Sequence, residues 1–329
     1  MIHFIIFVII YILLNTFLEN YNVENYNSKN KFKIIIYTFD NSDKSSGGTN
    51  VLNSLYDILI KEGYNVANYI YPMDINTIEI DKDNDISIYP EVIDNNPFGT
   101  KKVIRWILAE IGINKNKDVY KSWGENDLIY YYNKEKKFKE QPTKIGNIYK
   151  QLSILVYNEN INNFNHNQRK NMCHMFRKSH MHSEINYIHD SDSFEITSSK
   201  TQDECINIFN EYEYFISYDP LTFYTIIAGV CGCISIVYPM KGMTKTEWLK
   251  TSIFWDYLEK NNINNMYGIA WGKEDIEYAR STLHLLPELM NNIKKDIDNN
   301  GTKTFLKDLD KYLNLRNCNF ENTVQNNYY

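Results

Sequence analysis

The feature that most constrains the fold is a strand, loop, helix and strand in direct succession. Lys33–Phe39 (KIIIYTF) is a β-branched and aromatic run typical of a buried parallel strand. After the polar loop Asp40–Gly48, a helix is expected with Thr49 as its N-cap and one apolar face, made of Val51, Leu52, Leu55, Ile58 and Leu59. Gly63 ends this helix and Asn65–Tyr71 is the next strand. The pattern predicts a right-handed βαβ unit in a parallel sheet.

The alternation of strands and helices continues along the chain, which predicts an α/β fold. We expect further strands at Ile86–Tyr89, Leu128–Tyr132 and Leu152–Tyr157, and a helix at Gly99–Ile111. At 329 residues the chain is long enough for two domains. The pattern places them at residues 31–157 and 166–300, followed by a C-terminal helix at 303–316.

An apolar segment occupies residues 1–18, and a polar, Asn-rich linker follows at residues 19–30. Its uninterrupted apolar core, Phe4–Leu14, is shorter than the about 20 residues of a full membrane span. No Lys or Arg precedes this run and no small-residue cleavage site follows it, unlike a signal peptide. We expect an uncleaved anchor of marginal length and a membrane-associated protein. The alternatives are a cytoplasmic protein with a peripheral hydrophobic tail, or an upstream extension that is not part of the native fold.

Charge and cysteine content exclude two classes of protein. The formal net charge is −6, so no basic field covers the whole molecule, and no nucleic-acid partner is expected. Five cysteines, an odd number, do not make a disulfide framework, which favours a reducing compartment.

The second block holds the clearest candidate for a ligand site. The strand Tyr214–Ser217 leads to Pro220, which suits a first helical turn, and Gly232 suits a left-handed cap at the end of that helix. Residues 223–230 are apolar on all sides, so the helix is expected to be buried. Its N-terminus then opens at the carboxyl end of a parallel sheet, where α/β proteins bind anionic groups.

Five stretches in a fixed order carry a family resemblance. They are GGTNVLNSLYDILIKEGYNV (47–66), IYPEVIDNNPFGTKKVIRWIL (88–108), CHMFRKSH (173–180), YDPLTFYTIIAGVCGCISIVYPMKGMTKTEW (218–248) and MYGIAWGKEDIEYARSTLHLL (266–286). Together they resemble GT-B glycosyltransferases, and most closely the rhamnosyltransferase-like enzymes of bacterial glycan clusters and giant viruses. The resemblance covers residues 31–300 and implies two Rossmann-like domains facing across a cleft. It implies an acceptor-binding first domain and a second domain that binds the nucleotide sugar.

The resemblance also assigns roles to particular residues. It implies that the donor diphosphate is bound by one set of side chains and the glycine loop, namely Gly47, Gly48, Arg177, Lys178, Tyr218, Asp219 and Thr222. Arg177 and Lys178 would neutralise the leaving diphosphate. Each assignment has a structural alternative: Asp219 as a helix cap, Thr222 as a back-bonding hydroxyl, the glycines as a flexible loop, and the basic pair as a solvated surface.

One departure from the family pattern bears on the mechanism. Many retaining GT-B enzymes carry two glutamates before the Cys-Gly helix end, where this chain has Asp219 and Ile227. This favours the rhamnosyl-type subgroup, whose members match the YD..T pattern. An inverting enzyme needs a base, and no histidine lies between Phe4 and Asn165. The candidate bases are therefore the loop acids Asp40, Asp43 and Glu91, with Glu91 preferred because it lies inside a motif segment.

The remaining motifs favour no cofactor and no metal. His174, His180, His182 and His189 lie close together in sequence, but no partner has zinc-site spacing, and Cys231 and Cys233 suit buried apolar positions. No acidic chelating motif such as DxD is present, which fits a metal-independent transferase acting on a nucleotide-sugar donor and a glycan or glycoprotein acceptor. The alternative is a catalytically silent nucleotide-sugar-binding or scaffold protein. An extended-type epimerase would need GxGxxG after the first strand, which residues 40–50 lack.

Overall fold

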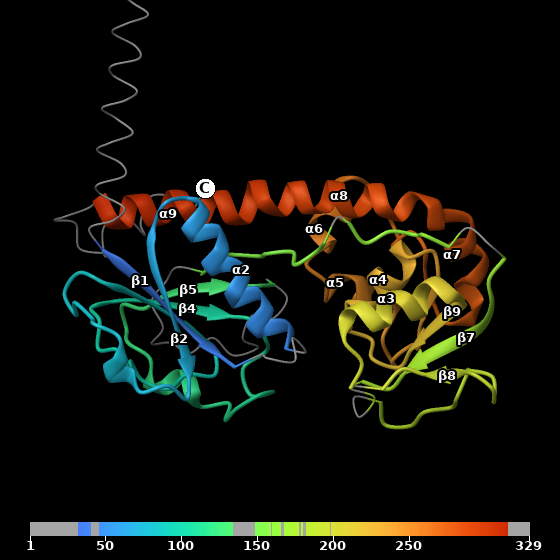
Figure 1. Ribbon diagram of the computed structural model, residues 1–329, viewed down its shortest axis with the longest axis horizontal. Coiled ribbons are helices and arrows are strands. Elements are labelled where there is room, and N and C mark those ends of the chain that lie inside the picture. The colour runs from blue at the N-terminus through green and yellow to red at the C-terminus, as the bar shows by residue number, and fades with distance from the viewer. Residues whose placement is uncertain are drawn as a thin grey trace, which may run out of the picture. The chain divides into compact units, whose positions relative to one another are not determined.

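A computed structural model describes residues 32–40, 46–133, 149–158, 160–165, 168–177, 179, 182–197 and 199–314 (Figure 1). The expected apolar segment, the linker, Asp43, Lys178 and His180 lie outside the described residues. The chain forms two compact units: the described residues up to 154 together with 301–314, and residues 155–300. Among the helices that the structure describes, none combines the length and apolarity needed to cross a bilayer.

The first unit is built on a six-stranded sheet in which every strand pairing is parallel. The strand order is β2-β1-β3-β4-β5-β6. The predicted strands at Lys33–Phe39 and Asn65–Tyr71 are confirmed in full, and the third ends one residue later than predicted. The strands are β1 (Lys33–Phe39), β2 (Asn65–Tyr71), β3 (Ile86–Pro90), β4 (Lys102–Ile107), β5 (Leu128–Tyr131) and β6 (Tyr149–Gln151).

Two predictions in this unit are wrong. The helix expected at Gly99–Ile111 is the strand β4, which is buried on both faces and therefore shows no amphipathic alternation. The strand expected at Leu152–Tyr157 is irregular, and the short strand β6 precedes it. Leu152 packs in the core of the first unit and Leu155 in that of the second, so this segment carries the chain from one unit to the other.

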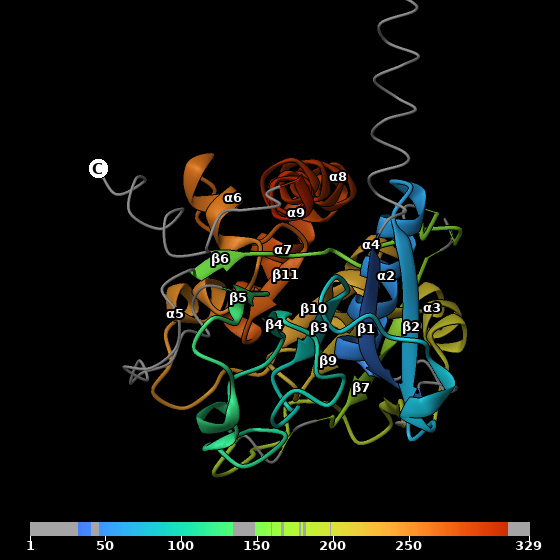
Figure 2. The same ribbon diagram turned by 90° about the vertical axis from the view of Figure 1, so that its left-hand side faces the viewer.

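Helices α2 (Gly47–Lys61) and α9 (Lys303–Asn314) cover one face of the first sheet (Figures 1 and 2). Leu52 and Leu55 of α2 share a buried cluster with Phe305 and Leu309 of α9. The C-terminal helix thus belongs to the core of the first unit, although the second unit precedes it in sequence. The N-cap of α2 is Ser46 rather than Thr49, so the two glycines lie in the first helical turn and not in the loop.

The second unit contains a five-stranded parallel sheet in the order β11-β10-β9-β7-β8. Helices α3, α4 and α8 pack with one buried cluster, while α7 packs against the other, so helices cover both faces of the sheet. This is the expected α/β architecture. The strands are β7 (Lys170–Met175), β8 (Phe194–Glu195), β9 (Tyr212–Ser217), β10 (Ile234–Val237) and β11 (Ile269–Trp271). The helices are α3 (Gln202–Glu211), α4 (Tyr224–Val230), α5 (Lys245–Lys250), α6 (Trp255–Lys260), α7 (Ile276–Thr282) and α8 (Leu286–Ile297).

Helix α4 is shorter than predicted at its start and ends where predicted. It begins at Tyr224, so Pro220 lies in the preceding turn rather than in the first helical turn. It ends before Gly232, whose φ of 91° is left-handed, and the Cys233 N–H bonds back to the carbonyl of Ala228. The seven-residue helix begins at the carboxyl edge of the sheet, and the expectation that its N-terminus binds an anionic group stays a prediction.

Candidate functional site

The carboxyl edge of the first sheet brings two of the candidate acids to one place. Asp40 directly follows β1 and is exposed, whereas Glu91 directly follows β3 and is buried. Strands β1 and β3 are neighbours with Ile36 paired to Ile88. Continued along both strands, this register sets Phe39 level with Glu91. The topology therefore gathers the two acids at one edge, as expected for residues that follow adjacent parallel strands.

The carboxylate of Glu91 is enclosed. Its side chain is 5% exposed, and its Oε2 accepts a hydrogen bond of 3.0 Å from the backbone N–H of Leu108, just beyond β4. Burial raises the pKa of Glu91, while hydrogen bonds from the Leu108 and Ala109 N–H groups act in the opposite direction. A carboxyl with a raised pKa is suited to accept a proton near neutral pH, and the same hydrogen bonds hold the end of β4 in place.

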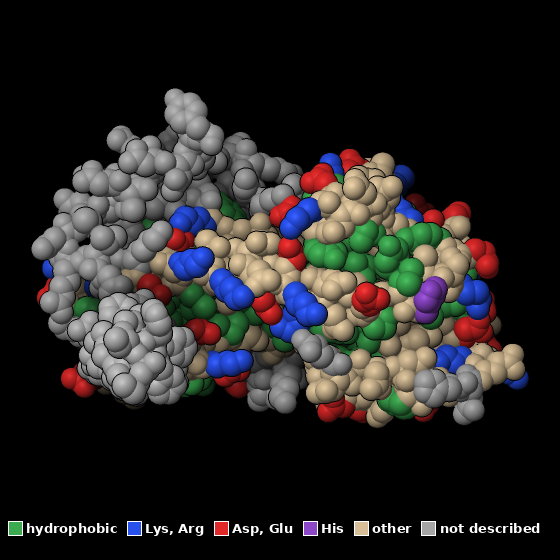
Figure 3. All heavy atoms as spheres, turned by 90° about the horizontal axis from the view of Figure 1, so that it is seen from above, with side chains coloured by type: hydrophobic (Ala, Val, Ile, Leu, Met, Phe, Trp, Pro, Cys, Tyr) green, Lys and Arg blue, Asp and Glu red, His purple; other side chains and the backbone are tan. Residues whose placement is uncertain are grey.

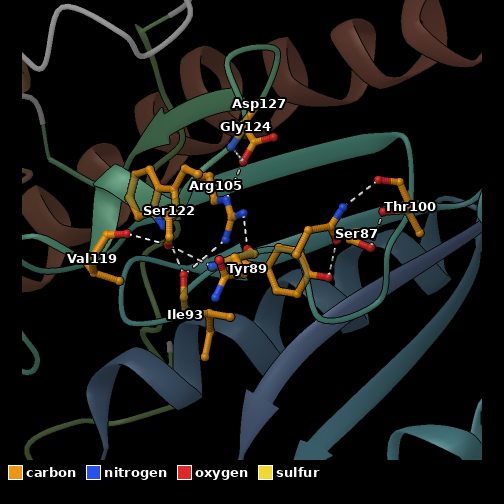
Figure 4. A network of polar contacts seen from close by, with 12 residues as sticks. Ser87, Tyr89, Ile93, Thr100, Arg105, Val119, Ser122, Gly124 and Asp127 are labelled. Atoms are coloured by element: carbon orange, nitrogen blue, oxygen red, sulfur yellow. Dashed lines mark hydrogen bonds and ion pairs between the residues drawn. The ribbon is translucent and has the colours of Figure 1, made fainter.

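A buried polar network fixes the loop that follows Glu91 (Figure 4). The hydroxyl of Tyr89 donates to Asn96 Oδ1 at 2.8 Å and accepts from the Phe98 N–H at 2.9 Å. Asn96 in turn donates through Nδ2 to the carbonyl of Thr100. These contacts close the loop over the face of the sheet opposite α2.

Arg105, on β4, is the centre of that network (Figure 4). Its side chain is fully buried, and its Nε donates to Asp127 Oδ2 at 2.7 Å. The two Nη atoms donate to the carbonyls of Ile93 and Asn95 in the loop after Glu91. The guanidinium also lies 4.7 Å from the ring centroid of Tyr89. Most of the polar side chains of segment 88–108 thus bond within the protein, a role that the sequence of this segment alone does not indicate.

The two glycines of the first unit lie at the start of α2. The Ser46 hydroxyl accepts from the Thr49 N–H at 3.3 Å and so caps the helix. A Cβ at Gly48 would lie 3.7 Å from Leu108 Cδ1, whereas a Cβ at Gly47 would meet nothing within 4 Å. Gly48 therefore lies beside the same β4 end that holds Glu91.

In the second unit, Arg177 follows β7 at the carboxyl edge of the sheet. Its guanidinium lies 5.7 Å from the ring centroid of Tyr224, the first residue of α4. The same edge carries Asp219, which follows β9 by two residues. Arg177 is half-buried, and Lys178 lies outside the described residues.

Asp219 and Thr222 form the turn between β9 and α4. Asp219 is 2% exposed, and its Oδ1 accepts from the Leu221 N–H at 2.9 Å. The Thr222 hydroxyl accepts from the Tyr224 N–H at 3.3 Å. Both side chains therefore have a backbone-capping role in the turn.

Tyr218 is fully buried, and its contacts are structural. Its hydroxyl accepts from the Ile188 N–H at 2.8 Å and lies 2.8 Å from His189 Nδ1. Its ring stacks on Phe176 with centroids 4.8 Å apart. These contacts secure the loop before β8, and the expected contact of Tyr218 with the donor stays a prediction.

The histidines of this unit form an aromatic cluster. His174 and His189 stack with ring centroids 3.8 Å apart and an interplanar angle of 5°, and His174 Nδ1 lies 2.8 Å from the Ser193 hydroxyl. Burial and the neighbouring His189 lower the pKa of His174 to about 4. Among the described residues, no group of three or more His, Cys, Asp or Glu side chains is placed to hold a metal ion. Cys231 and Cys233 are buried in the core, as predicted.

Comparison with known proteins gives a distant structural likeness. No family model and no curated protein matches the sequence. Among solved structures, an alpha-glucosyltransferase in complex with UDP matches with a TM-score of 0.47 and 10% identity, over 85% of this chain and 99% of that one. An alpha-glucosyltransferase in complex with UDP and a 13-mer DNA containing an HMU base matches with a TM-score of 0.44 and 10% identity, over 85% and 98%. A likeness this distant does not establish a shared activity.

Proposed function

We propose that the chain is a GT-B glycosyltransferase, which moves a sugar from a nucleotide-diphosphate donor to a glycan or glycoprotein acceptor. The observation that carries the proposal is that two separate parallel sheets each bear motif residues at their carboxyl edges. Glu91 follows β3 in the first unit, and Arg177 and Asp219 follow β7 and β9 in the second. The motif resemblance further favours a deoxyhexose such as rhamnose and a metal-independent reaction.

The proposed chemistry needs two kinds of help from the protein. As the bond between the anomeric carbon and the diphosphate oxygen breaks, the developing negative charge requires cations, which Arg177 and Lys178 would supply. As the acceptor oxygen forms its bond to that carbon, its proton requires a base if configuration is inverted. Glu91 is the preferred base because burial raises its pKa, and Asp40 is the second candidate.

A binding experiment tests the donor site. Arg177→Ala in the full chain is expected to weaken nucleoside diphosphate binding by about 1.5–3 kcal/mol, the range for hydrogen bonds to charged groups. Titration calorimetry measures the affinity, and Arg280→Ala is the matched control because Arg280 pairs with Glu213 on the surface. Equal affinity in the wild type and Arg177→Ala would contradict the role of Arg177.

A kinetic experiment tests the base. Glu91→Gln keeps an oxygen for the Leu108 N–H and removes the proton acceptor, so transfer is expected to slow by about 10²-fold or more. Asp40→Asn is measured alongside, with saturating donor. If neither variant slows transfer while donor binding is intact, neither acid is the base.

The alternative is a catalytically silent binding protein with the same fold. It would bind nucleoside diphosphates, and lose that binding in Arg177→Ala, without releasing diphosphate from any nucleotide sugar. The proposal includes no nucleic-acid partner. The described part of the face seen in Figure 3 carries Asp and Glu side chains as well as Lys and Arg.

A further inference from the structure

One face of the first sheet carries an unusual concentration of aromatic rings. Tyr37, on β1, lies at their centre, with its ring centroid 4.8 Å from Tyr69, 5.8 Å from Phe98 and 6.0 Å from Tyr89. All of these rings are buried. They form a rigid aromatic base under the carboxyl ends of β1 and β2.

The outer margin of this cluster is open to solvent. Tyr71 is 52% exposed, and Phe39, its register partner on β1, is half-buried. Their ring centroids lie 6.3 Å apart with an edge-on geometry, and Tyr71 also stacks on Tyr37 at 6.3 Å. An exposed aromatic ring that is held by buried neighbours offers a ligand a preorganised apolar surface.

These two residues lie in line with the candidate base. The strand order β2-β1-β3 sets Tyr71, Phe39 and Glu91 side by side at one level of the sheet edge, when the register of β1 and β3 is continued. Neighbouring strands are about 4.8 Å apart, so this row spans about 10 Å. Val92, directly after Glu91, packs against the same aromatic cluster as Phe39. A ring lying on Phe39 and Tyr71 would lie beside the end of β3, although the Glu91 carboxylate itself bonds on the β4 side, to the Leu108 N–H.

The polar groups at this margin suit an uncharged, hydroxylated ligand. The pKa of Tyr37 is raised to about 12 by burial and by the neighbouring Tyr69 and Tyr71, so its phenol stays neutral and can hydrogen-bond. The charged residues next to the exposed segment in sequence, Asp40 and Asp74, are both acidic and exposed. Their charge would repel a polyanion such as a nucleic acid.

We propose that Phe39 and Tyr71 form a stacking platform for a sugar ring of a neutral glycan acceptor. The apolar C–H face of the sugar would lie on the aromatic rings and its hydroxyls would meet the phenols. This inference rests on the proposed transferase function for the identity of its ligand, and on the exposed aromatic row for its position.

Direct binding tests the platform without any need for turnover. Saturation-transfer NMR on the full chain, with the methyl glycosides of rhamnose, glucose and galactose as probes, should show the strongest transfer to the C–H protons of one sugar face. Tyr71→Ala is expected to weaken this binding about 3–10-fold, the range for one aromatic contact, whereas Tyr71→Phe should retain most of it. Phe164→Ala is the control, because Phe164 is a 57% exposed aromatic residue in the second unit.

The outcomes separate this inference from the proposed function. If the glycosides bind and Tyr71→Ala weakens them, the platform stands even when no nucleotide sugar is turned over, and only the transferase proposal fails. If the protein transfers a sugar to an acceptor, and Tyr71→Ala changes neither glycoside binding nor the KM for that acceptor, the proposed platform is wrong. Binding of a single-stranded oligonucleotide that is lost in Tyr71→Ala, with no glycoside binding, would also overturn it. Phe39→Leu, which keeps an apolar side chain in the cluster, repeats the test independently of Tyr71.

Discussion

Arg105→Met removes the centre of the buried network and gives the sharpest test of how the first unit is held together. The guanidinium is fully buried and has three hydrogen-bonded partners: Asp127 and the carbonyls of Ile93 and Asn95. Methionine has an unbranched side chain that can occupy part of the same space, but it has no hydrogen-bond donor. The carboxylate of Asp127 then keeps only the Gly124 N–H, at 3.2 Å.

The magnitude follows from what is left without a partner. Removing one member of a buried ion pair costs about 3–5 kcal/mol. The carbonyl of Ile93 keeps the Trp123 Nε1–H at 3.0 Å, whereas that of Asn95 would add about 1–3 kcal/mol if no water reached it, so we expect a loss of at least about 3 kcal/mol. This is a large share of the about 5–15 kcal/mol that stabilises a typical domain.

A second substitution separates the charge from the loop contacts. In Arg105→Met/Asp127→Asn no buried charge is left unpaired, so the double variant should be less destabilised than the sum of the single variants, with a coupling of about 0.5–3 kcal/mol. In both cases the carbonyl of Asn95 has lost the Arg105 donor, and that of Ile93 keeps only the Trp123 Nε1–H. A residual loss in the double variant therefore measures the contribution of Arg105 to the loop.

Native-state hydrogen exchange of the β3, β4 and β5 amides measures the free energy of unfolding of the first unit without interference from the second. The control is Lys101→Ala, which breaks an exposed pair with Asp83 and should cost less than about 1 kcal/mol. A loss in Arg105→Met no larger than that of the control would refute the reasoning.

Two further predictions concern other parts of the fold. Phe305→Ala should destabilise the first unit by about 3–5 kcal/mol, because its buried ring packs edge-to-face on Tyr130 with centroids 5.0 Å apart; the same exchange measurement tests this, with exposed Lys307→Ala as control. His174→Gln should flatten the loss of stability on acidification between about pH 6.5 and pH 4. In that pH window His174 takes up a proton in the unfolded chain but not in the folded chain, where the pKa of His174 is lowered to about 4. Urea titrations across the range measure the free energy of unfolding against pH. A slope in His174→Gln equal to that in the control His284→Gln would contradict the prediction.

The elements that could be predicted are those whose signal is local. Strands β1 and β2 are short β-branched and aromatic runs, and Gly63 between them has the left-handed φ of 81° that only glycine adopts readily. Residue type and spacing within a few positions were enough to predict these two strands and the glycine that ends the helix between them. The same holds for Gly232 at the end of α4.

The elements that could not be predicted depend on distant partners. The strand β4 was predicted as a helix, and its Arg105 is fully buried, whereas a charged residue usually lies on a solvent face. The ion-pair partner of Arg105, Asp127, is 22 residues further along the chain, and no pattern in the residues around Arg105 indicates this pairing. The start of α4 was missed for a different and local reason: the Asp219 carboxylate caps a turn at Leu221, so the chain completes that turn before the helix begins.

The candidate site shows why motif residues differ in what they predict. Within the segment that resembles the family, Tyr89 bonds to Asn96, and Asn96 and Arg105 donate to backbone carbonyls of the loop after Glu91. These contacts fix the loop, and such a structural role constrains residue type as tightly as catalysis does. Glu91 differs from them, because its burial is an energetic cost that hydrogen bonds from the Leu108 and Ala109 N–H groups only partly offset. A carboxyl with a raised pKa, fixed at the carboxyl edge of a sheet, has the property that the proposed proton transfer needs. That difference in cost, rather than membership of the motif, makes Glu91 the residue to substitute first.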